Sequence, residues 1–159
     1  MARPFSATDA KRIIERHQNI IEKLNNAVSS VEKYRTKAKE ASDALVAQEV
    51  LKVLADIPIE EINRDKRGIR VKALRDYGYR TIADISTASV YSIASVHGIS
   101  EDAAYSIKSI VNDIVSKARQ GVKIRLSTDN RSKEATALVL ALSQYRRSQK
   151  VADECRQLL

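Results

Sequence analysis

A short segment near the middle of the chain has residues whose backbone could bind an anion. The segment is Val96-His97-Gly98-Ile99-Ser100, the Gly98 hairpin, which lies between two stretches of helical apolar periodicity. Gly98 can adopt the positive φ that a sharp turn needs. Ser100 suits the N-cap of a helix that Glu101 and Asp102 begin. The first N–H groups of a helix lack intrahelical partners, so we expect a nucleic-acid phosphate to bind here.

The residues before this hairpin form the most basic window of the sequence, from Asn63 to Arg80. Its acids are Asp65 and Asp76, and its cations are Arg64, Lys66, Arg67, Arg70, Lys72, Arg75 and Arg80. Such a cluster can neutralise backbone phosphates, and it would make affinity fall with salt. The alternative is an ordinary solvated face. Further candidates of the same kind are Lys108, Lys117, Arg119, Lys123 and Arg125.

A second glycine turn lies inside the basic window. The Gly78 hairpin, residues 76–81, contains Gly78, Tyr79 and Arg80, which are further candidates for nucleic-acid contact. Tyr77 and Tyr79 flank the glycine and could stack on bases, although we expect one of them to be buried. Thr81 and Asp84 have the spacing of a capping box, which predicts a helix start.

Side chains for catalysis are not grouped in this sequence. None of the four glycines begins a phosphate-binding P-loop motif. One cysteine and two distant histidines give no zinc-binding pattern. We therefore expect no catalytic residue, no metal site and no cofactor in this chain.

Composition and charge restrict the class of protein. The 159 residues carry a formal net charge of +8, which favours a polyanionic partner. The low content of Gly and Pro predicts an almost entirely helical chain. Cys155 is the single cysteine, which fits a reducing compartment. The sequence contains no apolar run of transmembrane length and no signal-peptide pattern at its start, so we expect a cytoplasmic location without membrane contact.

Long helices are predicted at both ends. Thr8 or Asp9 can cap a helix that continues to about Asp56. Apolar residues recur along it every three or four positions; they are Ile13, His17, Ile20, Leu24, Ala27, Val31, Tyr34, Ala38, Ala41 and Leu45, with Ile14, Ile21 and Val28 beside them. This stripe can pack on the chain's own C-terminal helix or form a homodimer, and both alternatives stay open.

The predicted elements divide the chain into three parts. Residues 1–57 form the helical, coiled-coil-like extension, residues 58–126 the central module, and residues 127–159 a C-terminal helix that packs on the first helix. Pro58 separates the extension from a short helix at Ile59–Asn63. Residues 122–126 alternate like a strand but have no evident partner, so we expect an extended connector. Ser132 can cap the last helix.

The segment from Ile69 to Ala118 resembles the tandem helix-hairpin-helix domain. The motif reads apolar-x-Gly-apolar-Gly, and the Gly98 hairpin matches it except that Ser100 replaces the second glycine. The Gly78 hairpin looks like a degenerate copy, with Asp76 where an apolar residue belongs. The resemblance implies an all-α fold with two hairpins that contact phosphates of both strands across the minor groove, flanked here by the long N- and C-terminal helices.

Other motifs resemble the accessory region that precedes the motor of bacterial DEAD/DEAH-type or Swi/Snf-type helicases. They are Ile59-x-Glu-Ile-Asn-Arg64, Gly68-Ile69-Arg70, Ile124-Arg125-Leu126-Ser127 and Asp129-Asn130-Arg131-Ser132. This resemblance implies binding of duplex or single-stranded DNA, with a motor domain in the same, longer protein. Because Leu158 and Leu159 are still apolar, we also expect the chain to be a piece. Two alternatives are a protein-interaction or oligomerisation module whose hairpins are structural, and an RNA binder.

Overall fold

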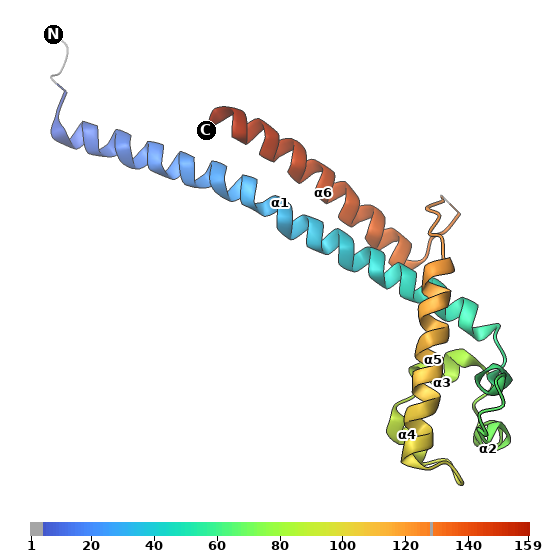
Figure 1. Cartoon of the computed structure of the whole chain (residues 1–159). Helices are drawn as coiled ribbons and strands as arrows, with labels where there is room; N and C mark the ends of the chain where they lie inside the picture. The colour runs from blue at the N-terminus through green and yellow to red at the C-terminus, as the bar shows by residue number, and fades with distance from the viewer. Residues whose placement is uncertain (1–4, 128) are drawn as a thin grey trace. The chain divides into compact units, whose positions relative to one another are not determined.

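The computed structural model describes residues 5–127 and 129–159. The described residues are mostly helical and include no strand, which confirms the all-α class (Figure 1). In chain order the helices are α1 (Ala7–Ala55), the 3₁₀ helix η1 (Ile59–Asn63), α2 (Val71–Tyr77), α3 (Ile82–Thr87), α4 (Val90–Ala94), α5 (Glu101–Gly121) and α6 (Lys133–Leu158). Residues 122–126 form the expected connector without a strand.

Three helix starts follow the caps that the sequence predicts. Thr81 and Asp84 form the capping box of α3, and the side chains of Ser100 and Ser132 cap α5 and α6. The expected cap of α1 was wrong. Ser6 caps that helix, because its Oγ accepts from the N–H of Asp9 at 3.2 Å while the Asp9 carboxylate accepts from the N–H of Ser6.

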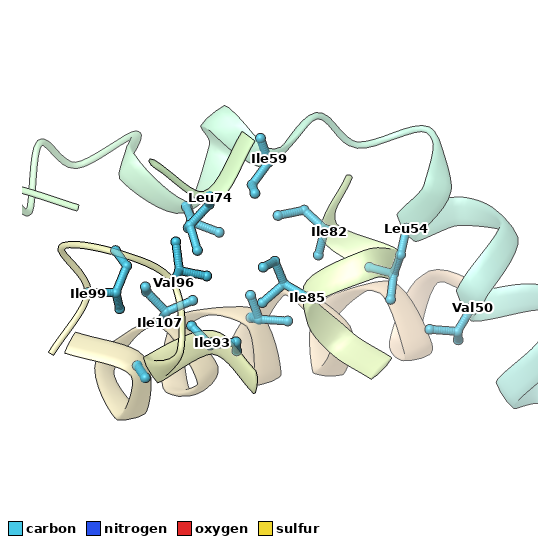
Figure 2. Packing of buried hydrophobic residues seen from close by; sticks show 13 residues of the cluster. Val50, Leu54, Ile59, Leu74, Ile82, Ile85, Ile93, Val96, Ile99 and Ile107 are labelled. Atoms are coloured by element: carbon cyan, nitrogen blue, oxygen red, sulfur yellow. The ribbon is translucent and has the colours of Figure 1, made fainter. Parts of the chain in front are cut away.

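Residues 44–127 form one compact unit with its own hydrophobic core. This unit begins before the boundary expected at Pro58, because the last turns of α1 supply core residues. Every helix of the unit contributes apolar side chains that are at most 8% exposed, and Figure 2 shows how they converge. They are Val50, Leu54, Ile59, Ile62, Leu74, Ile82, Ile85, Ile93, Val96, Ile99, Ala104, Ile107 and Val111. Removing this surface from water stabilises the short helices, which are too brief to persist alone.

Two helix–turn–helix pairs lie within this unit. The Gly78 hairpin joins α2 to α3, and the Gly98 hairpin joins α4 to α5. Both glycines have a positive φ, +121° for Gly78 and +86° for Gly98. At these two positions a side chain would strain the backbone, which explains why glycine stands at both turns.

Lys108 links the two pairs. From α5 its Nζ donates to the carbonyl oxygens of Ile85, Ser86 and Ala88 at 2.9–3.2 Å. These carbonyls lie at the C-terminal end of α3, where helix carbonyls lack partners and a cation is favoured. Lys108 is therefore engaged in holding α5 against α3, and it is not available as a phosphate contact.

The second compact unit consists of residues up to Asp43 together with the C-terminal segment that contains α6. Within it α6 runs back along α1 (Figure 1). Its buried residues are Ala38 from α1 and Ala135, Leu138, Ser148 and Ala152 from α6. Four of these five side chains are small, and Leu138 is the large one. Within this unit the chain's own C-terminal helix thus lies along part of the α1 stripe.

The first turns of α1, unlike the part of the helix near Ala38, are exposed to solvent. Every residue from Lys11 to Lys23 is exposed. Ile13, Ile14, Ile20 and Ile21 are 44–56% exposed, and His17 on the same stripe is also exposed. Four exposed isoleucines on one helix segment leave an apolar surface without a described partner.

In the described residues, no helix combines the length and apolar character needed to cross a membrane.

Candidate nucleic-acid interface

Core packing determines how the Gly98 hairpin presents its backbone. Val96 and Ile99 are 3% and 8% exposed, and Figure 2 shows both pointing into the core near Ile107. The N–H of Ile99 donates to the carbonyl of Val96 at 3.0 Å, which closes the turn. The residues between and after them, His97, Gly98 and Ser100, are exposed. Burial of the two apolar residues therefore turns the remaining backbone toward solvent.

The exposed residues of this hairpin carry N–H groups without partners. Among the described residues, the amides of His97, Gly98 and Ser100 donate no hydrogen bond. Ser100 caps the following helix by accepting from the N–H of Ala103 at 3.2 Å. The helix that begins here, α5, has 21 residues, so these donors lie at the positive end of a long helix. Glu101 and Asp102 share that end, but they are exposed to solvent.

Arg70 lies directly over the glycine of this hairpin. A Cβ added to Gly98 would come within 2.8 Å of Nη1 of Arg70, so a side chain there would displace the guanidinium. Arg70 is exposed and has no ion-pair partner in the part of the chain that the structure describes. Between the two segments is a groove of about 400 Å³, lined by the loop 67–70, the Gly98 hairpin and the first turns of α5. The groove thus combines an unpaired guanidinium with unpaired amides.

The loop before α2 delivers Arg70 to this position. Lys66 and Gly68 have positive φ values of +53° and +73°, which reverse the chain after η1. Asn63 holds the reversal, since its carbonyl accepts from the N–H of Lys66 at 2.9 Å and its Oδ1 accepts from the N–H of Ile69 at 3.3 Å. A side-chain amide that bonds to the backbone in this way favours a fixed loop.

The cations of the basic window divide into two groups. Three of them have carboxylate partners: Arg64 with Glu61 at 2.9 Å, Arg67 with Asp65 at 2.9 Å, and Arg75 with Glu60. Within the described residues, Lys66, Arg70, Lys72 and Arg80 have no carboxylate within ion-pair distance. The cations without a carboxylate partner therefore have more charge available to bind an anion from another molecule than the paired ones.

The Gly78 hairpin has no such free donors. Its amides at Gly78 and Tyr79 donate to the carbonyls of Arg75 and Leu74 at 3.0 and 3.1 Å. Those of Arg80 and Thr81 both donate to Oδ2 of Asp84, at 2.8 and 2.9 Å. A carboxylate of the chain itself thus occupies the anion-binding amides of this hairpin. Gly78, Tyr79 and Arg80 therefore lack the free amides that the Gly98 hairpin offers.

The contacts of Asp84 affect its protonation. The backbone N–H of Arg80 is the largest cause that lowers the pKa of Asp84 below its usual 3.8, and hydrogen bonds from Thr81 add to it against partial desolvation. The carboxylate is therefore ionised at neutral pH, and it occupies the amides as an anion.

The Tyr77 and Tyr79 rings of the same hairpin stack with their centroids 5.5 Å apart. Tyr79 packs against the core, whereas Tyr77 is exposed.

The sequence did not indicate two further features of this unit. Tyr91 and Tyr105 are exposed beside the Gly98 hairpin, and no ring contact involves them among the described residues. The partnership of Arg70 with Gly98 joins segments far apart in the chain, so no local pattern could reveal it. In the described part of the chain, no group of three or more metal-binding side chains is present.

No protein-family model matches this chain, and neither a curated protein nor a solved structure shows significant similarity to it.

The capping role of Asp84 predicts a pH-dependent stability. Because its pKa is lower in the folded state, the stabilisation is present at neutral pH and is lost as pH falls through that lowered value. Asp84→Asn should lower the unfolding free energy by about 1 kcal/mol at neutral pH. Urea unfolding at a series of pH values should show this difference shrinking below about pH 4. Asp76→Asn, an exposed acid of the same hairpin, is the control. A deficit that is constant with pH would contradict this role.

Proposed function

We propose that this chain binds DNA without reading its sequence, through the amides of the Gly98 hairpin and the cations of the loop before α2. The observation that carries the proposal is the position of the unpaired Arg70 guanidinium over Gly98, beside amides that have no internal partner. Backbone amides and guanidinium are both strong donors to phosphate oxygens. Neither group contacts a base edge when it binds phosphate, so no sequence preference follows.

The two hairpins differ in whether their backbone amides are free to bind a phosphate. In the Gly98 hairpin the donors are free, whereas in the Gly78 hairpin Asp84 already accepts from them. We therefore assign the phosphate contact to Val96–Ser100 and Arg70, and a structural role to the Gly78 hairpin. Repulsion from Asp84 would further disfavour a phosphate there.

The charge of the chain supports a polyanionic ligand. The net charge is +8, and Lys66, Arg70, Lys72 and Arg80 have no described ion-pair partner. Unpaired cations release counterions from DNA when they bind, whereas a cation already paired with a carboxylate contributes less. The surface cations that matter most are therefore expected to be the unpaired ones.

The proposed biological setting follows from the resemblances in the sequence. Two helix–turn–helix pairs agree with the order of a tandem helix-hairpin-helix module, and such a module serves as a targeting part of larger DNA-processing enzymes. We propose that this chain has that role in the cytoplasm, next to a motor of the helicase type in the same protein. In this setting the chain supplies binding, and the motor supplies chemistry.

Binding should depend on Arg70 more than on a paired arginine. Arg70→Gln should weaken binding to a labelled duplex by about tenfold at low salt, because a charge-assisted hydrogen bond contributes about 1.5 kcal/mol. It should also reduce the slope of log affinity against log salt by about one. Fluorescence anisotropy across a salt series measures both quantities. Arg75→Gln removes the same charge from an arginine paired with Glu60 and should have a smaller effect. Equal effects of the two substitutions would argue against the proposed site.

A second candidate function is self-association through the first turns of α1. It is favoured by the exposed isoleucines at positions 13, 14, 20 and 21, which continue the stripe that α6 covers farther along. Apolar residues at this spacing pair helices into coiled coils. A second copy of the chain offers the same stripe and so can cover it. This candidate is compatible with DNA binding, since the two surfaces belong to different units.

Two substitutions on the stripe test this second candidate. Ile14→Glu with Ile21→Glu places charges on the apolar surface and should convert a dimer to a monomer, because burying an unpaired carboxylate is costly. Light scattering gives the molar mass of each protein over a concentration series. Asn19→Glu with Asn26→Glu adds the same charge at exposed positions on the opposite side of α1 and should leave the dimer intact. A wild-type chain that is monomeric at all concentrations would rule out self-association.

A further inference from the structure

Two tyrosines beside the Gly98 hairpin are unusually exposed. Tyr91 from α4 is 84% exposed and Tyr105 from α5 is 58% exposed. Together they line a hollow of about 290 Å³, the tyrosine pocket, whose other residues are Val90, Ala94, Ser95 and Glu101. Aromatic rings contribute most to stability when they are buried. Their exposure around a hollow points to a ligand with a flat apolar face.

The pocket adjoins the proposed phosphate site through the chain itself. Ser95 and Glu101 are the residues directly before and after the Gly98 hairpin. Glu101 and Tyr105 are four residues apart and therefore lie on the same face of α5. The groove with Arg70 is lined instead by Ala103, Ser106 and Ile107 of that helix. The tyrosine pocket and the phosphate groove thus involve different residues of the first turns of α5.

The chemistry of the pocket suits a nucleobase. Val90 and Ala94 offer apolar surface, and the phenol rings offer faces on which any base can stack. The Glu101 carboxylate can accept hydrogen bonds from the exocyclic amine of adenine or cytosine. A nucleotide carries its base and phosphate on one sugar, so a strand with its phosphate on the hairpin has a base close by.

We infer that the tyrosine pocket binds an unpaired base of a DNA strand whose phosphate lies on the Gly98 hairpin. The inference rests on the proposed DNA binding and adds the class of substrate: duplex DNA with a single-stranded segment. Bases within a duplex are stacked and paired, so they are not free to enter the pocket. Stacking on aromatic side chains should then favour a tailed duplex over a blunt one by about tenfold.

The test compares three DNA ligands with the full chain: a blunt duplex, the same duplex with a deoxyadenosine tail, and the same duplex with an abasic tail. The abasic tail keeps the phosphates and removes the bases. Anisotropy should show about tenfold tighter binding of the adenosine tail than of the abasic tail. Tyr91→Ala with Tyr105→Ala should abolish that difference, whereas Tyr91→Phe with Tyr105→Phe should keep it because the ring faces remain. Phe5→Ala removes an exposed aromatic of the other unit and is the control.

The outcomes separate this inference from the function on which it rests. If the blunt duplex binds and depends on Arg70 while the adenosine and abasic tails bind equally, the pocket takes no base and the inference is overturned, while the hairpin proposal stands. If the alanine variant retains the full preference for the adenosine tail, the base binds elsewhere and the inference is again overturned. If no DNA binds even at low salt, both proposals fail together.

Discussion

The proposed interface depends on the burial of Val96 and Ile99 on either side of the turn at Gly98. Because both side chains lie in the core, the residues between and after them are exposed, and their N–H groups have no partner among the described residues. The same packing aligns α5 so that its first turn begins at this exposed segment. Unpaired donors at a helix start attract an anion. The proposed anion site thus follows from how the core is packed, and Arg70 adds a guanidinium to its backbone donors.

The two hairpins show how one residue can change the use of a repeated element. Both turn at a glycine with positive φ, and both lead into a capped helix. In the Gly78 hairpin the third residue of α3 is Asp84, whose carboxylate accepts from two backbone amides. In the Gly98 hairpin that helix position is Ala103, which cannot accept a hydrogen bond. An internal anion therefore satisfies the first hairpin, whereas the second is left open for an external one.

Local features of the fold could be predicted from the sequence, and features that join distant segments could not. The caps at Thr81, Ser100 and Ser132 depend on neighbouring residues, so their spacing sufficed. Within the basic window, no local pattern distinguishes Arg70 from Arg75. Their difference arises because Arg75 meets Glu60 of η1 while Arg70 meets the Gly98 hairpin. The exposure of Tyr91 likewise depends on how α4 packs on α5.

The most direct test of the central claim is to observe the hairpin amides themselves during DNA binding. Amide NMR spectra of the isotope-labelled chain, recorded while a short duplex is added, report on each N–H separately. We expect the largest shifts at His97, Gly98 and Ser100, whose amides have no partner among the described residues, and little change at Gly78, Tyr79 and Arg80, whose amides are occupied. Equal shifts in both hairpins, or shifts confined to other residues, would contradict the account.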